Sequence, residues 1–151
     1  MAAQTIEHGP PVKQFSVMLQ NRVGALAALV KMLRMSAIEV MGLSVQDARD
    51  ATIARIVVSD PEQAEQIFLE KGIPHTVCEL LVVELKEAGP NLLQCLDHLM
   101  GAETNIDFAY PLLPVYRGYS LLALHVDDLE FAASVLSSAG FVLLWQDSLS
   151  R

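Results

Sequence analysis

The feature that most limits how this chain can fold is an internal repeat. When the sequence is shifted by 66 positions, two apolar patterns align with themselves in the same register. The first pattern alternates, as in a half-buried strand, and aligns Phe15, Val17 and Leu19 with Leu81, Val83 and Leu85. The second follows the i, i+3, i+4, i+7 spacing of a helix face and aligns Leu26, Leu29, Val30 and Leu33 with Leu92, Cys95, Leu96 and Leu99. The chain is therefore interpreted as two copies of one structural unit.

Both copies continue with the same predicted elements. Two strands and a capped helix are predicted within residues 37–72 of the first copy and within residues 105–140 of the second. A last apolar strand follows each helix, and the first of these runs almost directly into the opening strand of the second copy. The order strand, helix, strand, strand, helix, strand is that of the ferredoxin-like fold. We expect an α+β protein with antiparallel sheets and the helices of each unit on one sheet face.

A unit of about 65 residues is only marginally stable alone, so the two units are expected to pack as a pseudo-dimer. The predicted boundaries are a flexible N-terminal tail over residues 1–12, a first unit over 13–79 and a second over 80–151. Met18, Met41, Val82 and Phe108 are the apolar side chains available for the sheet faces that the helices leave bare.

Charge and composition restrict the function classes. The net charge is −8, which disfavours nucleic acid and anionic membrane surfaces, because Lys and Arg supply most of the affinity for phosphate. The apolar runs are shorter than the roughly 20 residues that a membrane span needs. Two cysteines do not make a disulfide framework, and the first residues do not resemble a signal peptide. A cytoplasmic location is expected.

The segment "LQNRVGALAALVKML", residues 19–33, joins a predicted strand to a strongly amphipathic helix. A helix N-terminus presents unpaired backbone N–H groups and the positive end of the helix dipole, which suits a carboxylate. Gly24 has no Cβ and allows close approach, the Asn21 amide can donate and accept, and Arg22 can pair with an acidic group. From these residues alone, both a plain glycine turn and a small anion or amino-acid site remain open.

The strand that ends in "NRVGAL" and opens an amphipathic helix resembles the ACT domain, and the twofold repeat resembles the tandem ACT proteins. The resemblance extends over about residues 13–149. It implies a regulatory protein that binds a small effector, usually an amino acid, between the first strand-helix turn of one unit and a neighbouring unit. The family's Asp or Asn position matches Asn21, its glycine matches Gly24 and its apolar anchor matches Leu26. Val23 stands where proline or a small residue is usual. The resemblance places the ligand at Asn21, Arg22, Val23, Gly24, Ala25 and Leu26.

The second copy departs from this pattern. Glu87 replaces the Asn21 position and would repel an anion, while Pro90 replaces Gly24 and lacks a backbone N–H. We therefore expect the first-copy turn to be the working site and treat the second as a structural copy. The second strand of either unit is the expected far wall of the site. Weaker candidates for ligand contact are Ile38, Glu39, Val40, Met41, Gly89, Asn91 and Tyr110.

The sequence disfavours both metal and catalytic sites. Cys95 and His98 are three residues apart on a helix, but Cys95 aligns with the core residue Leu29, and four zinc ligands are not present. His125 and Asp127 could form a base with an orienting carboxylate, but no nucleophile motif accompanies them. No metal, no cofactor and no enzymatic activity are expected.

We therefore predict a non-catalytic regulator of amino-acid metabolism, a homodimer that binds a free amino acid and transmits this binding to a partner enzyme or regulator. The alternative is a ligand-free regulatory subunit or adaptor that binds a metabolic enzyme or transcription regulator. That adaptor would use an open sheet face and the loop at residues 111–119.

Overall fold

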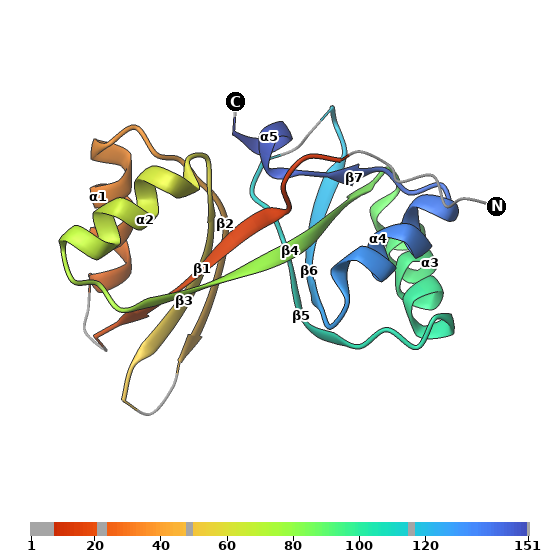
Figure 1. Ribbon diagram of the computed structural model, residues 1–151, viewed down its shortest axis with the longest axis horizontal. Helices are drawn as coiled ribbons and strands as arrows, with labels where there is room; N and C mark the ends of the chain where they lie inside the picture. The colour runs from red at the N-terminus through yellow and green to blue at the C-terminus, as the bar shows by residue number, and fades with distance from the viewer. Residues whose placement is uncertain (1–7, 21–23, 48–49, 115–116, 151) are drawn as a thin grey trace.

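A computed structural model describes residues 8–20, 24–47, 50–114 and 117–150 (Figure 1). The first half contains β1 (Val12–Leu19), α1 (Ala25–Met35), β2 (Val40–Asp47), β3 (Thr52–Val58), α2 (Pro61–Glu70) and β4 (His75–Leu85). The second half contains α3 (Ala88–Gly101), β5 (Ile106–Pro111), β6 (Ser120–Val126), α4 (Leu129–Ser138), β7 (Leu143–Leu144) and α5 (Gln146–Leu149). Among these helices, none is long and apolar enough to cross a membrane.

The 11-residue strand β4 belongs to both halves. Residues 75–80 of β4 pair antiparallel with β1, whereas residues 81–85 pair with β6 and residues 82–83 with β7. The last strand of the first unit is thus continuous with the first strand of the second unit. Because no linker separates the two roles, the hydrogen-bond registers on β4 fix how the two sheets are oriented (Figure 1).

The predicted fold class is confirmed. The sheet order is β2-β3-β1-β4-β6-β5, with β7 paired to β4, so each unit has the strand arrangement of a βαββαβ ferredoxin-like fold. Helices α1 and α2 cover the sheet of the first unit and α3 and α4 that of the second, and the two helical pairs lie at opposite ends of the molecule (Figure 1).

The sheet faces without helices cover one another. Strand alternation sends Phe15 and Val17 of β1 toward the helices, and sends Val12 and Gln14 into the space between the two halves. That central core is formed by Val12, Val57, Leu80, Val82, Tyr110, Leu112, Leu121, Ala123, Leu144 and Leu149, with Met41, Cys78 and Phe108 packed against it. The prediction for Met41, Val82 and Phe108 is confirmed, whereas Met18 is 52% exposed and does not belong to this core.

The outer edges of the curled sheet meet at one point. Gly42 of β2 forms an isolated antiparallel bridge with Leu112, and the Leu113 N–H donates to the Met41 carbonyl at 2.8 Å. A Cβ on Gly42 would lie 2.5 Å from the Leu112 Cδ2 and 3.3 Å from the Val57 Cβ. A side chain at this position would have to displace the Leu112 methyl group and press on Val57, so glycine allows the closest packing of the two segments.

One polar pair is enclosed in the central core. Gln14 is 0% exposed, and its Oε1 accepts a 2.6 Å hydrogen bond from the Tyr110 hydroxyl. Its Nε2 donates to the Ser16 Oγ at 3.2 Å and to the Cys78 Sγ at 3.3 Å. Burial raises the pKa of Tyr110, which keeps the hydroxyl protonated as a donor. The pair joins β1 of one unit to β5 of the other.

The two chain ends are held together at the top of this core. The side chain of Gln146 in α5 accepts from the Lys13 N–H and donates to the Val58 carbonyl and the Ser150 hydroxyl. The Gln146 N–H donates to the Pro10 carbonyl, and the His8 ring stacks on Trp145 at 3.9 Å. Within the described part of the predicted tail, residues 8–11 are thus packed against the C-terminal segment.

Tyr110→Phe should destabilise the protein through the Gln14 acceptor that it leaves unpaired. An unsatisfied buried polar group costs about 1–3 kcal/mol, and each kcal/mol lowers the unfolding midpoint by roughly 2–4 °C in a protein of this size. Thermal unfolding followed by circular dichroism measures this, with Tyr119→Phe as the control at a half-buried tyrosine of the same unit. Equal midpoints for the two variants would contradict the assigned role of this hydrogen bond.

Gly42→Ala should open the junction between β2 and β5, because its Cβ overlaps Leu112. We expect a loss of stability and faster amide exchange at Leu113, whose N–H bonds across the junction. Gly101→Ala is the matched control, since a Cβ there has nothing within 4 Å. Unchanged exchange at Leu113 in Gly42→Ala would show that the junction tolerates a side chain.

Candidate functional site

In the strand-helix turn of the first unit, no described residue crowds the Gly24 position. Gly24 is the N-cap of α1 with φ of 87°, a conformation that favours glycine, and a Cβ there would meet nothing within 4 Å. The first helical hydrogen bond runs from the Ala28 N–H to the Gly24 carbonyl, so the N–H groups of residues 25–27 precede the helical ladder. The predicted ligand residues Asn21, Arg22 and Val23 lie outside the described residues.

The charge around this helix end differs from that of its neighbours. Helix α1 has no side-chain cap at its described N-cap and no acidic residue in its first turn. By contrast, α2 and α4 are capped by the carboxylates of Asp60 and Asp128, and each has a glutamate in its first turn. The positive end of the α1 dipole therefore lacks the carboxylates that partly neutralise α2 and α4, and it suits an external anion better than they do.

The corresponding turn of the second unit is already occupied by its own side chains. The Asn91 Oδ1 accepts from the Glu87 N–H at 2.8 Å, and the Asn91 Nδ2 donates to the Gln94 Oε1 at 3.1 Å. Pro90 stands in the first turn of α3 and removes one backbone donor, while Gly89 faces open space. These features favour the first-unit turn as the anion site of the pair.

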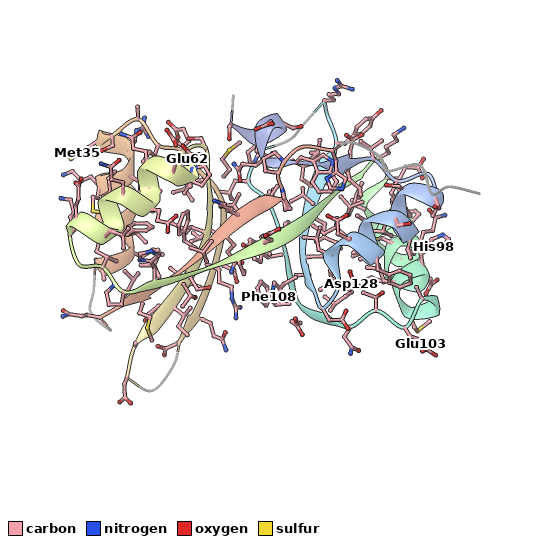
Figure 2. All side chains as sticks on the ribbon, viewed as in Figure 1. Met35, Glu62, His98, Glu103, Phe108 and Asp128 are labelled. Carbon is pink, nitrogen blue, oxygen red and sulfur yellow. The ribbon has the colours of Figure 1, made fainter. Side chains whose placement is uncertain are left out.

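The expected far wall does not approach the first-unit turn within one chain. Residues 38–41 follow the C-terminal end of α1, whose 11 residues span about 16 Å. In Figure 2, Met35 at that end lies at the same edge of the molecule as Glu62, the edge away from the start of α1. Ile38 is 1% and Tyr110 is 7% exposed, so both are packed into cores and have little surface for a ligand. Within the described residues, neither Ile38 nor Tyr110 therefore forms a ligand wall opposite residues 24–26.

Glu39, Val40 and Met41 instead line a groove of about 830 Å³ where the two halves meet. The groove combines the start of α2, the C-terminal residues around Gln146 and the segment around Pro11. Four carboxylates line it against one lysine, Lys13, so it is unfavourable for an amino-acid carboxylate; the acids are Glu39, Asp60, Glu62 and Asp147. Sequence reasoning missed this groove as a whole because its residues come from several distant segments.

A stacked cluster bridges the halves at the opposite opening of the central core. The Arg55 guanidinium lies 4.0 Å from the centroid of the Phe108 ring, and Phe108 stacks on His125 at 4.8 Å. The His125 Nδ1 lies 2.7 Å from the Asp107 Oδ2, so Asp107, and not Asp127, is the carboxylate beside this histidine. Figure 2 shows Phe108 in the region between the two halves. Asp107 was not predicted, and only the pairing of β5 with β6 could have identified it.

Metal ligation finds no support in the part of the chain that the structure describes, where no three His, Cys, Asp or Glu side chains are grouped to hold an ion. Cys95 is buried in the core of the second unit, as its alignment with Leu29 indicated. Burial raises the pKa of Cys95 to about 11 and also raises that of Cys78, where Arg55 partly opposes the effect. Neither thiol has the lowered pKa of a reactive nucleophile.

The sequence matches the family model described as "ACT domain pair" over residues 11–149. The chain therefore belongs to the ACT domain pair family, which confirms the resemblance seen in the sequence. The comparison with curated proteins returns no significant match.

Solved structures share the fold at low sequence identity. Protein BT0572 from Bacteroides thetaiotaomicron is similar with a TM-score of 0.84 and 20% identity, over 93% of this chain and 96% of that one. The ligand-free regulatory subunit of aspartate kinase from Thermus thermophilus has a TM-score of 0.59 and 12% identity, over 87% and 92%. The corresponding subunit from Thermus flavus has a TM-score of 0.55 and 15% identity, over 87% and 92%. At these identities, the similarity establishes the fold.

The two thiols should differ in reactivity toward a thiol reagent at pH 8. Cys78 is half-buried and should react slowly in the folded protein, whereas Cys95 should react only on unfolding, because it is 0% exposed and protonated at that pH. Mass spectrometry of labelled peptides separates the two sites, and Cys78→Ser should remove the native-state labelling. Native labelling of Cys95 at the Cys78 rate would contradict its burial.

Proposed function

We propose that this protein is a non-catalytic regulator that binds a free amino acid by its carboxylate at residues 21–26. The observation that carries the proposal is the start of α1, where no described side chain caps the helix and Gly24 leaves three consecutive backbone N–H groups uncrowded by a side chain of its own. Membership of the ACT domain pair family supports a regulatory role. We place this role in amino-acid metabolism in the cytoplasm.

We also propose a homodimer, and the geometry of that site supports it. One chain supplies an open helix end at Gly24, but its own second strand begins at the far end of α1. A second copy can place its second strand opposite the first copy's turn and enclose the ligand. Binding would then change the association of the two copies, and a partner enzyme or regulator would respond to that change. A ligand can shift such an equilibrium only by its differential affinity for the two states.

The adaptor alternative loses one of its two expected surfaces, the open sheet face, whereas Leu113 in the expected loop is exposed. The sheet faces without helices are buried, with Val82 and Ala123 at 0% and Leu121 at 1% exposure, so they cannot receive a partner. The outer face of α3 provides another apolar surface, because Leu93 is 62% and Met100 is 71% exposed. A partner that docks on α3 without any small ligand is therefore the second candidate function.

A thermal-unfolding screen with each of the twenty amino acids separates the two candidates. At one hundred times its Kd, a ligand adds about 2.7 kcal/mol of stability, which corresponds to a midpoint shift of several degrees. The effector should also change the sedimentation of the protein if the copies enclose it. A flat response to the whole panel would reject the sensor function and leave the α3 surface as the functional one.

Gly24→Ala should abolish the response to the amino-acid effector, and Gly72→Ala should leave it intact. Both glycines have positive φ, at 87° and 65°, and in both cases an added Cβ meets nothing within 4 Å. The two variants therefore carry a similar backbone penalty of about 1–2 kcal/mol, but only Gly24 lies at the proposed carboxylate site. Isothermal titration calorimetry measures both, and equal affinities in the two variants would reject residues 21–26 as the site.

A further inference from the structure

Residues 8–11, which we call the strap, precede β1 and lie against the C-terminal segment. The Pro10 carbonyl accepts a 3.0 Å hydrogen bond from the Gln146 N–H. A Cβ on Gly9 would lie only 3.2 Å from the Asp147 Oδ2, so the two segments are closely packed. In Figure 1 the chain that leads into β1 passes beside β7. The strap is therefore an ordered contact between the two ends of the described chain.

His8 fastens the outer end of the strap through both of its ring nitrogens. Its Nδ1 lies 3.2 Å from the Gly9 carbonyl oxygen, and its Nε2 lies 3.3 Å from the Glu130 Oε2 in the first turn of α4. A carbonyl oxygen and an ionised carboxylate only accept hydrogen bonds, and a neutral imidazole has only one N–H to donate. Both contacts are therefore satisfied together only by the imidazolium form of the ring.

The other histidines do not share this arrangement. His75 and His125 each place one ring nitrogen on an acceptor, and His98 places none on an acceptor in the described part of the chain. A neutral ring satisfies one acceptor without difficulty. Among the histidines that the structure describes, His8 is thus the one whose contacts require a second ring proton.

The surroundings of His8 also favour a cation. Its ring lies 3.9 Å from the Trp145 ring with 7° between the two planes, so an imidazolium would face the π-system of the indole. Lys13, the nearest basic residue along the chain, lines the groove between the two halves, and Glu7 lies outside the described residues. Residues 127–150, which include α4 and α5, contain no Lys or Arg and four acids: Asp127, Asp128, Glu130 and Asp147.

The strap forms one wall of the groove of about 830 Å³ between the two halves. Pro10 and Pro11 line this groove together with Gln146 and Asp147, the residues that the strap contacts. The start of α2 lines the same groove. Detachment of the strap would remove its wall, so the position of the strap determines how far the groove is open.

We propose that residues 8–11 form a pH-sensitive strap, which is fastened over the groove when His8 is protonated and is released when the ring loses its proton. Histidine is the side chain that ordinarily changes its charge between pH 5 and 8. The contacts that depend on the proton are present at the low end of this range and are lost as the pH rises. The strap is independent of the amino-acid site proposed at residues 21–26.

The size of the effect follows from the contacts that deprotonation removes. The neutral ring loses one of its two hydrogen bonds and the cation–π contact with Trp145. Because exposed ion pairs and cation–π contacts are each weak, the closing equilibrium of the strap should change by roughly 3- to 30-fold. A change of this size is sufficient at a chain end, since such segments are among the least stable parts of a fold.

The emission of Trp145 tests the proposal, because it is the only tryptophan of the chain. A stacked imidazolium quenches indole fluorescence, so the emission of the full chain should rise between about pH 5 and 8. His8→Gln cannot titrate and should lack this transition, whereas Glu130→Gln should move its midpoint to lower pH by removing an acceptor that favours the cation. His125→Gln is the matched control and should keep the wild-type transition, since His125 is paired with Asp107 and not with the strap.

Amide exchange separates release of the strap from a change of charge alone. The Gln146 N–H is bonded to the strap, and its protection, corrected for the intrinsic pH dependence of exchange, should fall by roughly 3- to 30-fold over the same pH range. The Leu113 N–H, which bonds to the Met41 carbonyl, is the internal control and should keep its protection. In His8→Gln, the protection of Gln146 should be low at both ends of the range.

Three results would each overturn the proposal. The first is a wild-type emission of Trp145 that does not change over this pH range. The second is an emission change that persists in His8→Gln, because the transition would then belong to another group. The third is a protection of Gln146 that is independent of pH, since the strap would then remain fastened in both protonation states of His8.

Discussion

The whole structure depends on the hydrogen bonding of one strand. Strand β4 uses its first six residues to complete the sheet of one unit and its last five to begin the sheet of the next. This continuity brings the two bare sheet faces together, so that the apolar residues of each unit cover those of the other. Units of this size bury only about 60% of their surface alone, and the shared strand supplies the missing partner within the same chain.

This arrangement also brings the outer strands β2 and β5 of the curled sheet together, and two specific contacts form between the units. Gly42 lets the outer strands touch at Leu112, and the Gln14–Tyr110 pair links β1 to β5 inside the core. A satisfied polar pair in an apolar core costs little, but it penalises any other register of the two sheets, because its members would lose their partners. The contacts that close the sheet therefore also select one relative position of the two units.

The repeat in the sequence was sufficient to predict the fold class, because strand and helix periodicities are local, and the family was identified from the repeat together with the "NRVGAL" motif. Helix caps are also local, as the side chains of Asp60 and Asp128 at the starts of α2 and α4 show. The candidate site was harder to predict because ligand grooves combine distant segments. Asp107 reaches His125 only through the β5–β6 pairing, and Ile38 proved to be a core residue.

Continuity of β4 also limits how such a molecule can transmit a signal. Two domains on a flexible linker can rotate about a hinge, but two sheets that share a strand have no hinge between them. Rotating one unit would break the ladder on β4 and expose the central core to water. Information about an occupied groove must then travel as small adjustments along a rigid body, or as a change in which other molecules that body joins. A protein of this architecture transmits changes between its two ends as one body, and it does not close around a ligand as two hinged domains do.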